Sequence, residues 1–89
     1  MAYTELQRTA ELLREAAADC TGEPKKRLEG FADECDELAE REKKPDHGRL
    51  DKIQNGLHEI AGDVDPEVAR QVQQARKALI SFRKTVPGV

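Results

Sequence analysis

Apolar residues in the second half of the chain recur every three or four positions, in two sets separated by a short polar turn. The first set is Leu50, Ile53, Leu57, Ile60 and Val64, and the second is Val68, Val72, Ala75, Leu79, Phe82 and Val86. Residues three and four apart share one face of a helix, so each set forms a continuous apolar stripe. The pattern predicts two amphipathic helices, over residues 48–61 and 66–85.

The turn between these two stripes contains residues that are typical of helix ends. Gly62 can adopt the left-handed conformation that ends a helix. Asp65 can accept amide hydrogens at the start of the next helix, and Pro66 suits the first turn of that helix. Glu67 adds a negative charge near the positive end of the helix dipole. A stop signal followed so closely by a start signal predicts an antiparallel helical hairpin.

The first half of the chain resembles a looser copy of this hairpin, with helices expected over residues 4–20 and 24–42. Their stripes are Leu6, Ala10, Leu13, Ala17 and Cys20, widened by Leu12 and Ala16, and then Leu28, Phe31, Cys35 and Leu38. Thr4 and Gln7 fit a capping box at the start of the first helix. Asp46 is expected to cap the third helix.

A shift of 44 residues superposes the two halves without a gap. Leu6 then falls on Leu50, Leu13 on Leu57 and Cys35 on Leu79, and the stripes and turns share one phase. Two similar hairpins, each with one apolar side, are most simply buried against each other. We therefore expect an all-α fold, a single domain over residues 1–89 in which two antiparallel helical hairpins form a four-helix bundle.

Two glycines lie inside predicted helices, Gly30 and Gly56, where each costs about 1 kcal/mol relative to alanine. Isolated glycines are often tolerated in helices or allow close packing against a neighbouring helix. A second interpretation is a notch that accepts the side chain of a partner. We favour the first interpretation.

The composition agrees with a helical domain and narrows the classes of function. Charged residues make up 37% of the 89 residues and aromatic residues 3%, and together with helical periodicity this is typical of a bundle or coiled coil. No apolar run approaches the ~18–20 residues that span a membrane, and the N-terminus has no signal-peptide pattern. We therefore expect a cytoplasmic protein that does not act at a membrane. The net charge of −3 argues against a protein that mainly coats nucleic acid.

The charges are unevenly distributed along the chain. Residues 23–42 contain eight acids and four bases, whereas residues 65–86 contain two acids and five bases. The simplest interpretation is that these two helices are neighbours whose surfaces attract each other.

The residues that could carry chemistry do not form a recognisable site. Cys20, Cys35, His47 and His58 lack the close spacings of zinc ligands, and neither histidine follows a glutamate by three positions as in di-iron bundles. Ser81 lies on a helix without a nucleophile elbow. Both cysteines occupy stripe positions roughly 15 Å apart along the bundle, given a helical rise of ~1.5 Å per residue, so two buried, reduced thiols are expected.

The carboxylates Glu29, Asp33, Asp36, Glu37 and Glu40 could suggest acid–base chemistry or a cation site, but their spacing is more typical of a solvated helix face. No glycine-rich phosphate loop is present. We expect no enzymatic activity, no cofactor, no metal and no small-molecule substrate.

One feature of the last helix suggests a binding surface. Arg70, Lys77 and Lys84 recur every seven residues, opposite the apolar stripe, with Gln73 and Gln74 beside them and Arg76 and Arg83 on the flank. We call Arg70, Lys77 and Lys84 the cationic ridge. The ridge could be solvated or paired within the chain, could bind a protein partner or a second copy of the chain, or could contact nucleic-acid phosphates. Solvation or pairing within the chain ranks first among these interpretations. No aromatic residue accompanies the ridge for base stacking, so a protein partner ranks next and nucleic acid last.

The stretch from Arg49 to Arg83 follows an acidic helix and a proline-containing loop. It includes Leu57-His58-Glu59-Ile60, Asp65-Pro66-Glu67-Val68-Ala69 and Ala75-Arg76-Lys77. It resembles small helical proteins of unknown function from haloarchaea, over most of the chain, and the shared motifs are helix caps and stripes. The resemblance implies a cytoplasmic, high-salt setting and no catalytic residues. In one respect the chain departs from that pattern, because seven lysines and a net charge of −3 are unusual for haloarchaeal proteins.

Overall fold

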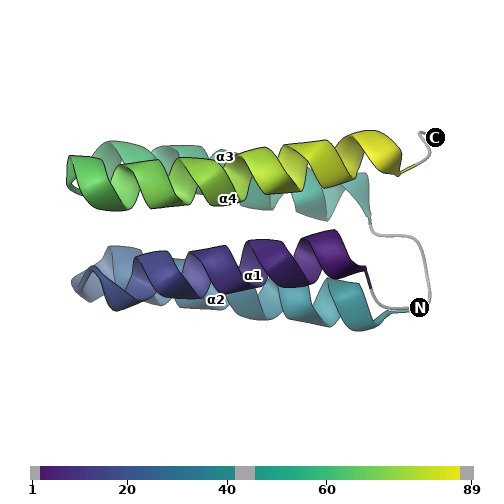
Figure 1. Cartoon of the computed structure of the whole chain (residues 1–89), viewed down its shortest axis with the longest axis horizontal. Helices are drawn as coiled ribbons and strands as arrows, with labels where there is room; N and C mark the ends of the chain where they lie inside the picture. The colour runs from purple at the N-terminus through teal and green to yellow at the C-terminus, as the bar shows by residue number, and fades with distance from the viewer. Residues whose placement is uncertain (1–2, 42–45, 87–89) are drawn as a thin grey trace.

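Four α-helices follow one another along the chain, each bearing one of the four apolar stripes (Figure 1). The computed structural model describes residues 3–41 and 46–86. The helices are α1 (Thr4–Ala18), α2 (Gly22–Glu40), α3 (His47–Asp63) and α4 (Pro66–Thr85). Every helix end lies within two residues of the position that the sequence predicted, and the limits of α4 coincide with it. The predicted end of the second helix at residue 42 falls outside the described residues.

The helices form a four-helix bundle of two antiparallel hairpins, as the sequence predicted. α1 packs against α2 and α4, α4 also packs against α3, and α2 and α3 are the neighbouring pair that packs least closely. In Figure 1 the pair α1 and α4 lies in front and the pair α2 and α3 behind. The two hairpins therefore meet mainly along the α1–α4 seam, and α2 and α4 lie across a diagonal of the bundle.

One hydrophobic core runs along the bundle and contains most of the predicted stripe residues. Leu12, Cys20, Phe31, Val64 and Val86 are only partly buried against it. Ala32, Ala39 and Thr9 are additional buried residues. Thr9 is tolerated there because its hydroxyl donates a 2.9 Å hydrogen bond to the carbonyl oxygen of Glu5, one turn earlier. None of the described helices is both long enough and apolar enough to cross a membrane.

Two of the predicted helix starts are confirmed, whereas one is wrong. The carboxylate of Asp65 accepts a 3.0 Å hydrogen bond from the Val68 amide, and that of Asp46 accepts a 2.8 Å bond from the Gly48 amide. The predicted capping box at Thr4 is absent, because Thr4 is already the first residue of α1 and its hydroxyl bonds Glu5. Tyr3 takes the N-cap position, where its amide bonds the Ala39 carbonyl of α2 at 3.2 Å.

The prediction for Gly62 is also wrong. Gly62 stays inside α3, which continues to Asp63 and ends at Val64 in an extended conformation. Within the described residues, the one glycine with a positive φ is Gly22, at 72°, where the chain turns from α1 into α2. The left-handed conformation therefore occurs at the earlier turn, where glycine adopts it without the steric cost of a Cβ atom.

The acidic helix and the basic helix are not neighbours, so the expectation that they attract each other is wrong. Carboxylates of α2 instead pair with arginines of α1 and α3. Arg14 lies 3.0 Å from Asp33 and 2.7 Å from Asp36, and Arg49 lies 3.7 Å from Glu34. Because α2 and α4 lie across the diagonal, their outer faces point away from each other.

Candidate functional site

The cationic ridge lies on the outer face of α4, as the spacing predicted. Arg70, Lys77 and Lys84 are all exposed. Successive members are two helical turns, or about 10.5 Å, apart along the helix axis. Exposed Gln74 and Ser81 lie between them and carry no charge. Among the described residues, none of the three cations has an ion-pair or hydrogen-bond partner.

The flanking arginines belong to the α3–α4 seam rather than to the ridge. Arg83 lies 3.0 Å from Asp51 and donates a 3.1 Å hydrogen bond to the side-chain oxygen of Gln54. Arg76 donates a 3.3 Å bond to the main-chain carbonyl of Gln54. These contacts hold Arg76 and Arg83 against α3. Within the described part of the chain, the three ridge cations are therefore the free positive charges on the outer side of α4.

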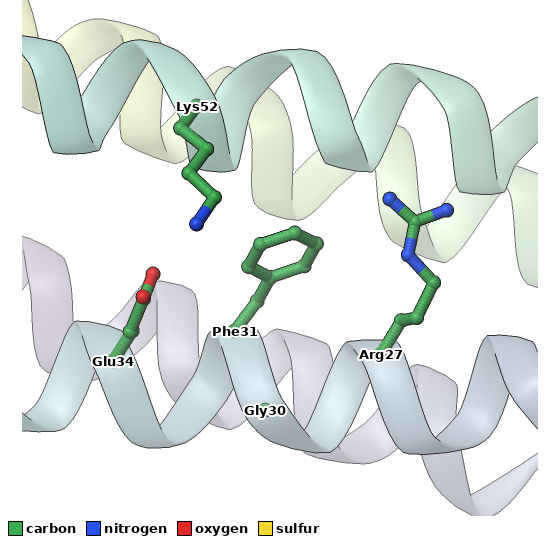
Figure 2. Close-up of a pocket in the computed structure, with 5 residues that line it drawn as sticks. All are labelled: Arg27, Gly30, Phe31, Glu34 and Lys52. Carbon is green, nitrogen blue, oxygen red and sulfur yellow. The ribbon is translucent and has the colours of Figure 1, made fainter.

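A second candidate surface is a groove of about 390 Å³ between α2 and α3, the neighbouring pair that packs least closely. Figure 2 shows its lining, which is Arg27, Gly30, Phe31 and Glu34 of α2 and Lys52 of α3. The Phe31 ring extends from α2 toward Gly56 of α3. A Cβ atom at Gly56 would press on Cζ of that ring and lie 2.7 Å from Cε2, so glycine is what permits this contact. The favoured interpretation allowed either tolerance or close packing, and at Gly56 the structure shows close packing.

The charges of this groove largely neutralise one another. The guanidinium of Arg27 lies 5.9 Å from the centre of the Phe31 ring and 3.1 Å from Glu59. Lys52 and Glu34 point toward each other across the groove (Figure 2). The Glu34 Oε2 atom is buried and accepts no hydrogen bond from the described residues, while its other oxygen faces Arg49. With its own aromatic ring and balanced charges, the groove acts as a seam between the hairpins.

Sequence reasoning did not find this groove. It placed Phe31 on the core stripe and treated Gly56 as an isolated residue. The available signal was the pair itself, an aromatic residue and an unexplained helical glycine on two different predicted helices. At Gly30, by contrast, a Cβ atom would meet no described atom within 4 Å, so no packing contact explains that glycine.

The cysteines and histidines are not assembled into a site. Both thiols are free, and Cys35 is buried as predicted, whereas Cys20 is only partly buried. Burial raises the pKa of the Cys35 thiol to about 12, with the nearby Glu34 carboxylate adding to the effect. Burial also raises the pKa of Cys20. His58 is exposed on α3. In the described parts of the chain, no three metal-binding side chains come together.

A comparison with known proteins places the chain in a family. The profile of a family of unknown function, DUF7553, matches residues 1–85. The chain belongs to the DUF7553 family. No curated protein and no solved structure matches it.

The match covers all four helices, so the bundle as a whole is the DUF7553 unit in this chain. Both the ridge of α4 and the groove between α2 and α3 lie within it. The family description assigns no activity, and the function of this DUF7553 protein has to be argued from its own surfaces.

Proposed function

We propose that this protein is a small, non-enzymatic helical bundle that acts as a protein-interaction or assembly module. Its binding surface is the cationic ridge of Arg70, Lys77 and Lys84. One observation carries the proposal: these three cations are exposed, evenly spaced and unpaired among the described residues, while Arg76 and Arg83 beside them are held by α3. The partner surface is acidic, with carboxylates that repeat about every two helical turns.

Non-enzymatic action is part of the same proposal. The buried Cys35 thiol stays protonated at neutral pH because burial raises its pKa, so it is a poor nucleophile. Ser81 stands exposed on the outer side of α4, among the ridge cations. The proposal includes no cofactor, metal or small-molecule substrate.

The alternative is an auxiliary nucleic-acid-binding protein that uses the same ridge. Cations spaced along a helix can contact phosphates, and such binding weakens steeply with salt. The positions of the aromatic residues favour a protein partner instead. Tyr3 packs edge-on against Phe82 at 5.4 Å, and Phe31 fills the groove between α2 and α3, so none of these three rings accompanies the ridge to stack on bases.

The proposal also includes the origin and cellular location of the protein. The resemblance of residues 49–83 to haloarchaeal helical proteins supports a haloarchaeal origin and a cytoplasmic location. In molar salt the Debye length is about 3 Å, so long-range attraction is lost. The ridge would then work through direct ion pairs in a close interface rather than by steering a distant partner.

A capture experiment tests the proposal. The wild-type protein, the triple variant Arg70→Ala/Lys77→Ala/Lys84→Ala and a control are immobilised and exposed to nuclease-treated extract of the source cells. The control, Arg8→Ala/Lys26→Ala/Lys52→Ala, removes three exposed cations that also lack ion-pair partners among the described residues. Circular dichroism checks that all three proteins are folded. Captured proteins are identified and retested in purified form.

The ridge variant should lose most of the captured protein, while the control retains it. Equal capture by the ridge variant and the wild type would remove the ridge from the account. The nucleic-acid alternative is tested by gel retardation of duplex DNA and single-stranded RNA at low salt. Retardation of either that disappears in the ridge variant would favour the alternative over a protein partner.

A further inference from the structure

The outer face of α2 carries a counterpart of the cationic ridge with mostly opposite charge. The offset of 44 residues places Lys26, Asp33 and Glu40 of α2 at the positions that Arg70, Lys77 and Lys84 occupy in α4. All six residues are exposed. Each set recurs every seven residues, about 10.5 Å along its helix. The same structural row is therefore cationic in one hairpin and largely anionic in the other.

The rest of the exposed surface of α2 strengthens this contrast. Its exposed charged residues are five acids and one base, Glu23, Glu29, Asp33, Glu37, Glu40 and Lys26. The exposed charged residues within α4 are the three ridge cations and Glu67. Glu29 and Glu40 have no ion-pair partner among the described residues, whereas Asp33 contacts Arg14 and Glu37 contacts Arg41. Glu29 and Glu40 are thus available for an intermolecular contact.

These two faces cannot neutralise each other within one chain. α2 and α4 lie across the diagonal of the bundle, and the core fills the space between them. Their outer sides point in opposite directions, as the arrangement of the four helices in Figure 1 shows. The molecule is therefore acidic along one long edge and basic along the opposite edge. A surface of opposite charge with the same seven-residue spacing can therefore come only from another molecule.

We infer that a second copy of this chain is a partner of the cationic ridge, through the acidic outer face of its α2 helix. The inference rests on the proposed function and names the partner of that same surface. Lys77 and Lys84 of one copy face Glu40 and Asp33 of the next, with the two helices antiparallel, because both pairs have the same seven-residue spacing and this direction keeps Arg70 away from Lys26. Glu29 adds a further carboxylate to the contact.

Such a contact uses two different surfaces, so it is head-to-tail. Each copy that binds through its ridge still offers its own acidic face, and the chain of copies grows unless it closes into a ring. Exposed ion pairs each contribute little, so the association is weak and depends on concentration. It is also sensitive to salt, because the Debye length falls from about 10 Å at 0.1 M to about 3 Å at 1 M.

Sedimentation velocity tests the inference on the full chain, between about 10 μM and 1 mM, the range of weak contacts. At low salt the average mass should rise with concentration to roughly twice the 10.0 kDa of one chain or more, and at the same protein concentrations it should be lower in about 1 M salt. A mass of one chain at every concentration in low salt would overturn the inference.

Charge reversal locates the contact. The variant Lys77→Glu/Lys84→Glu is acidic on both edges. The variant Glu29→Lys/Glu40→Lys keeps the basic ridge, but its outer α2 face carries three acids and three bases and is no longer acidic. Each alone should sediment as one chain, whereas an equimolar mixture should assemble, because the acidic α2 face of the first variant then meets the intact ridge of the second. The control Arg8→Glu/Lys52→Glu has the same net charge as the first variant but leaves both faces intact, so it should still assemble. Loss of assembly in this control, or no assembly in the mixture, would contradict the proposed faces.

The result is distinguishable from failure of the proposed function. If the wild-type protein sediments as one chain but the ridge variant captures fewer partners from extract, the inference fails and the proposed function stands. If the ridge variant captures as much protein as the wild type and also assembles normally, both the inference and the proposed function fail.

Discussion

The contact between Phe31 and Gly56 predicts that Gly56→Ala destabilises the protein. A second substitution, at Phe31, should reverse the sign of this change in stability. The ring of Phe31 crosses from α2 to α3, and a Cβ atom at Gly56 would press on Cζ and lie 2.7 Å from Cε2. Real Cβ atoms do not approach a carbon so closely, so Gly56→Ala has to push the ring toward the open groove. The substitution therefore opposes the packing of the two hairpins at their weakest seam.

Two effects of known size determine the result. Forcing an extra methyl into a packed contact typically costs about 1–3 kcal/mol. Replacing glycine by alanine inside a helix stabilises the helix by about 1 kcal/mol. Gly56→Ala should therefore lower the free energy of unfolding by about 1 kcal/mol. In a Phe31→Ala background the obstacle is gone, and the same substitution should raise the free energy of unfolding by about 0.5–1 kcal/mol.

Urea denaturation followed by circular dichroism measures all four proteins of this cycle. Gly30→Ala is the matched control, because a Cβ atom at Gly30 meets nothing within 4 Å, and it should stabilise the protein by about 0.5–1 kcal/mol. The reasoning is refuted if Gly56→Ala stabilises the wild-type protein as much as Gly30→Ala does, because the ring then does not need the glycine.

Four further substitutions test the core, a cap and a thiol. Leu57→Ala and Leu79→Ala, both at fully buried positions, should each cost about 2–5 kcal/mol in urea denaturation, and losses below about 1 kcal/mol at both would mean that the stripes do not share one core. Asp65→Ala removes the acceptor of the Val68 amide and should cost about 1 kcal/mol in the same assay; no change would contradict its role as a cap. Burial raises the pKa of the Cys35 thiol from 9.0 to about 12. As pH rises, the thiol therefore loses its proton in the unfolded chain before it does so in the folded protein. The stability that the buried thiol contributes is complete below pH 9 and is lost as pH rises toward 12. Above pH 9 the free energy of unfolding of the wild type should fall by up to about 1.4 kcal/mol per pH unit more than that of Cys35→Ala. If the free energies of unfolding of the two proteins change with pH in parallel, the thiol is not shielded from solvent.

The helices could be predicted from the sequence because their apolar stripes and two of their caps are local signals. Asp46 and Asp65 cap the helices that they precede, and Leu57 and Leu79 lie in the core. The error at Thr4 has a tertiary cause. Tyr3 is held by Ala39 of α2 and by Phe82 of α4, and it therefore takes the cap position, which no local signal assigns to it.

The relative positions of the helices were harder to predict, because they depend on which hairpin faces meet. The charges of α2 and α4 suggested neighbours, but the packing places these helices on a diagonal, and Arg14 and Arg49 pair with α2 instead. The outward direction of the cationic ridge did follow from the sequence, since it depends only on the period of α4. The groove beside Phe31 did not, because it depends on the distance between two helices.

The most direct test of the account is a comparison of lysine reactivity in the purified protein and in nuclease-treated extract of the source cells. Acetylation rates are measured by mass spectrometry at Lys77 and Lys84 on the ridge and at Lys52, an exposed lysine away from it. Lys77 and Lys84 should react more slowly in extract than in the dilute purified protein, while the rate at Lys52 should not change. Equal rates at all three lysines in both samples would mean that no protein covers the ridge, and would contradict the proposed function.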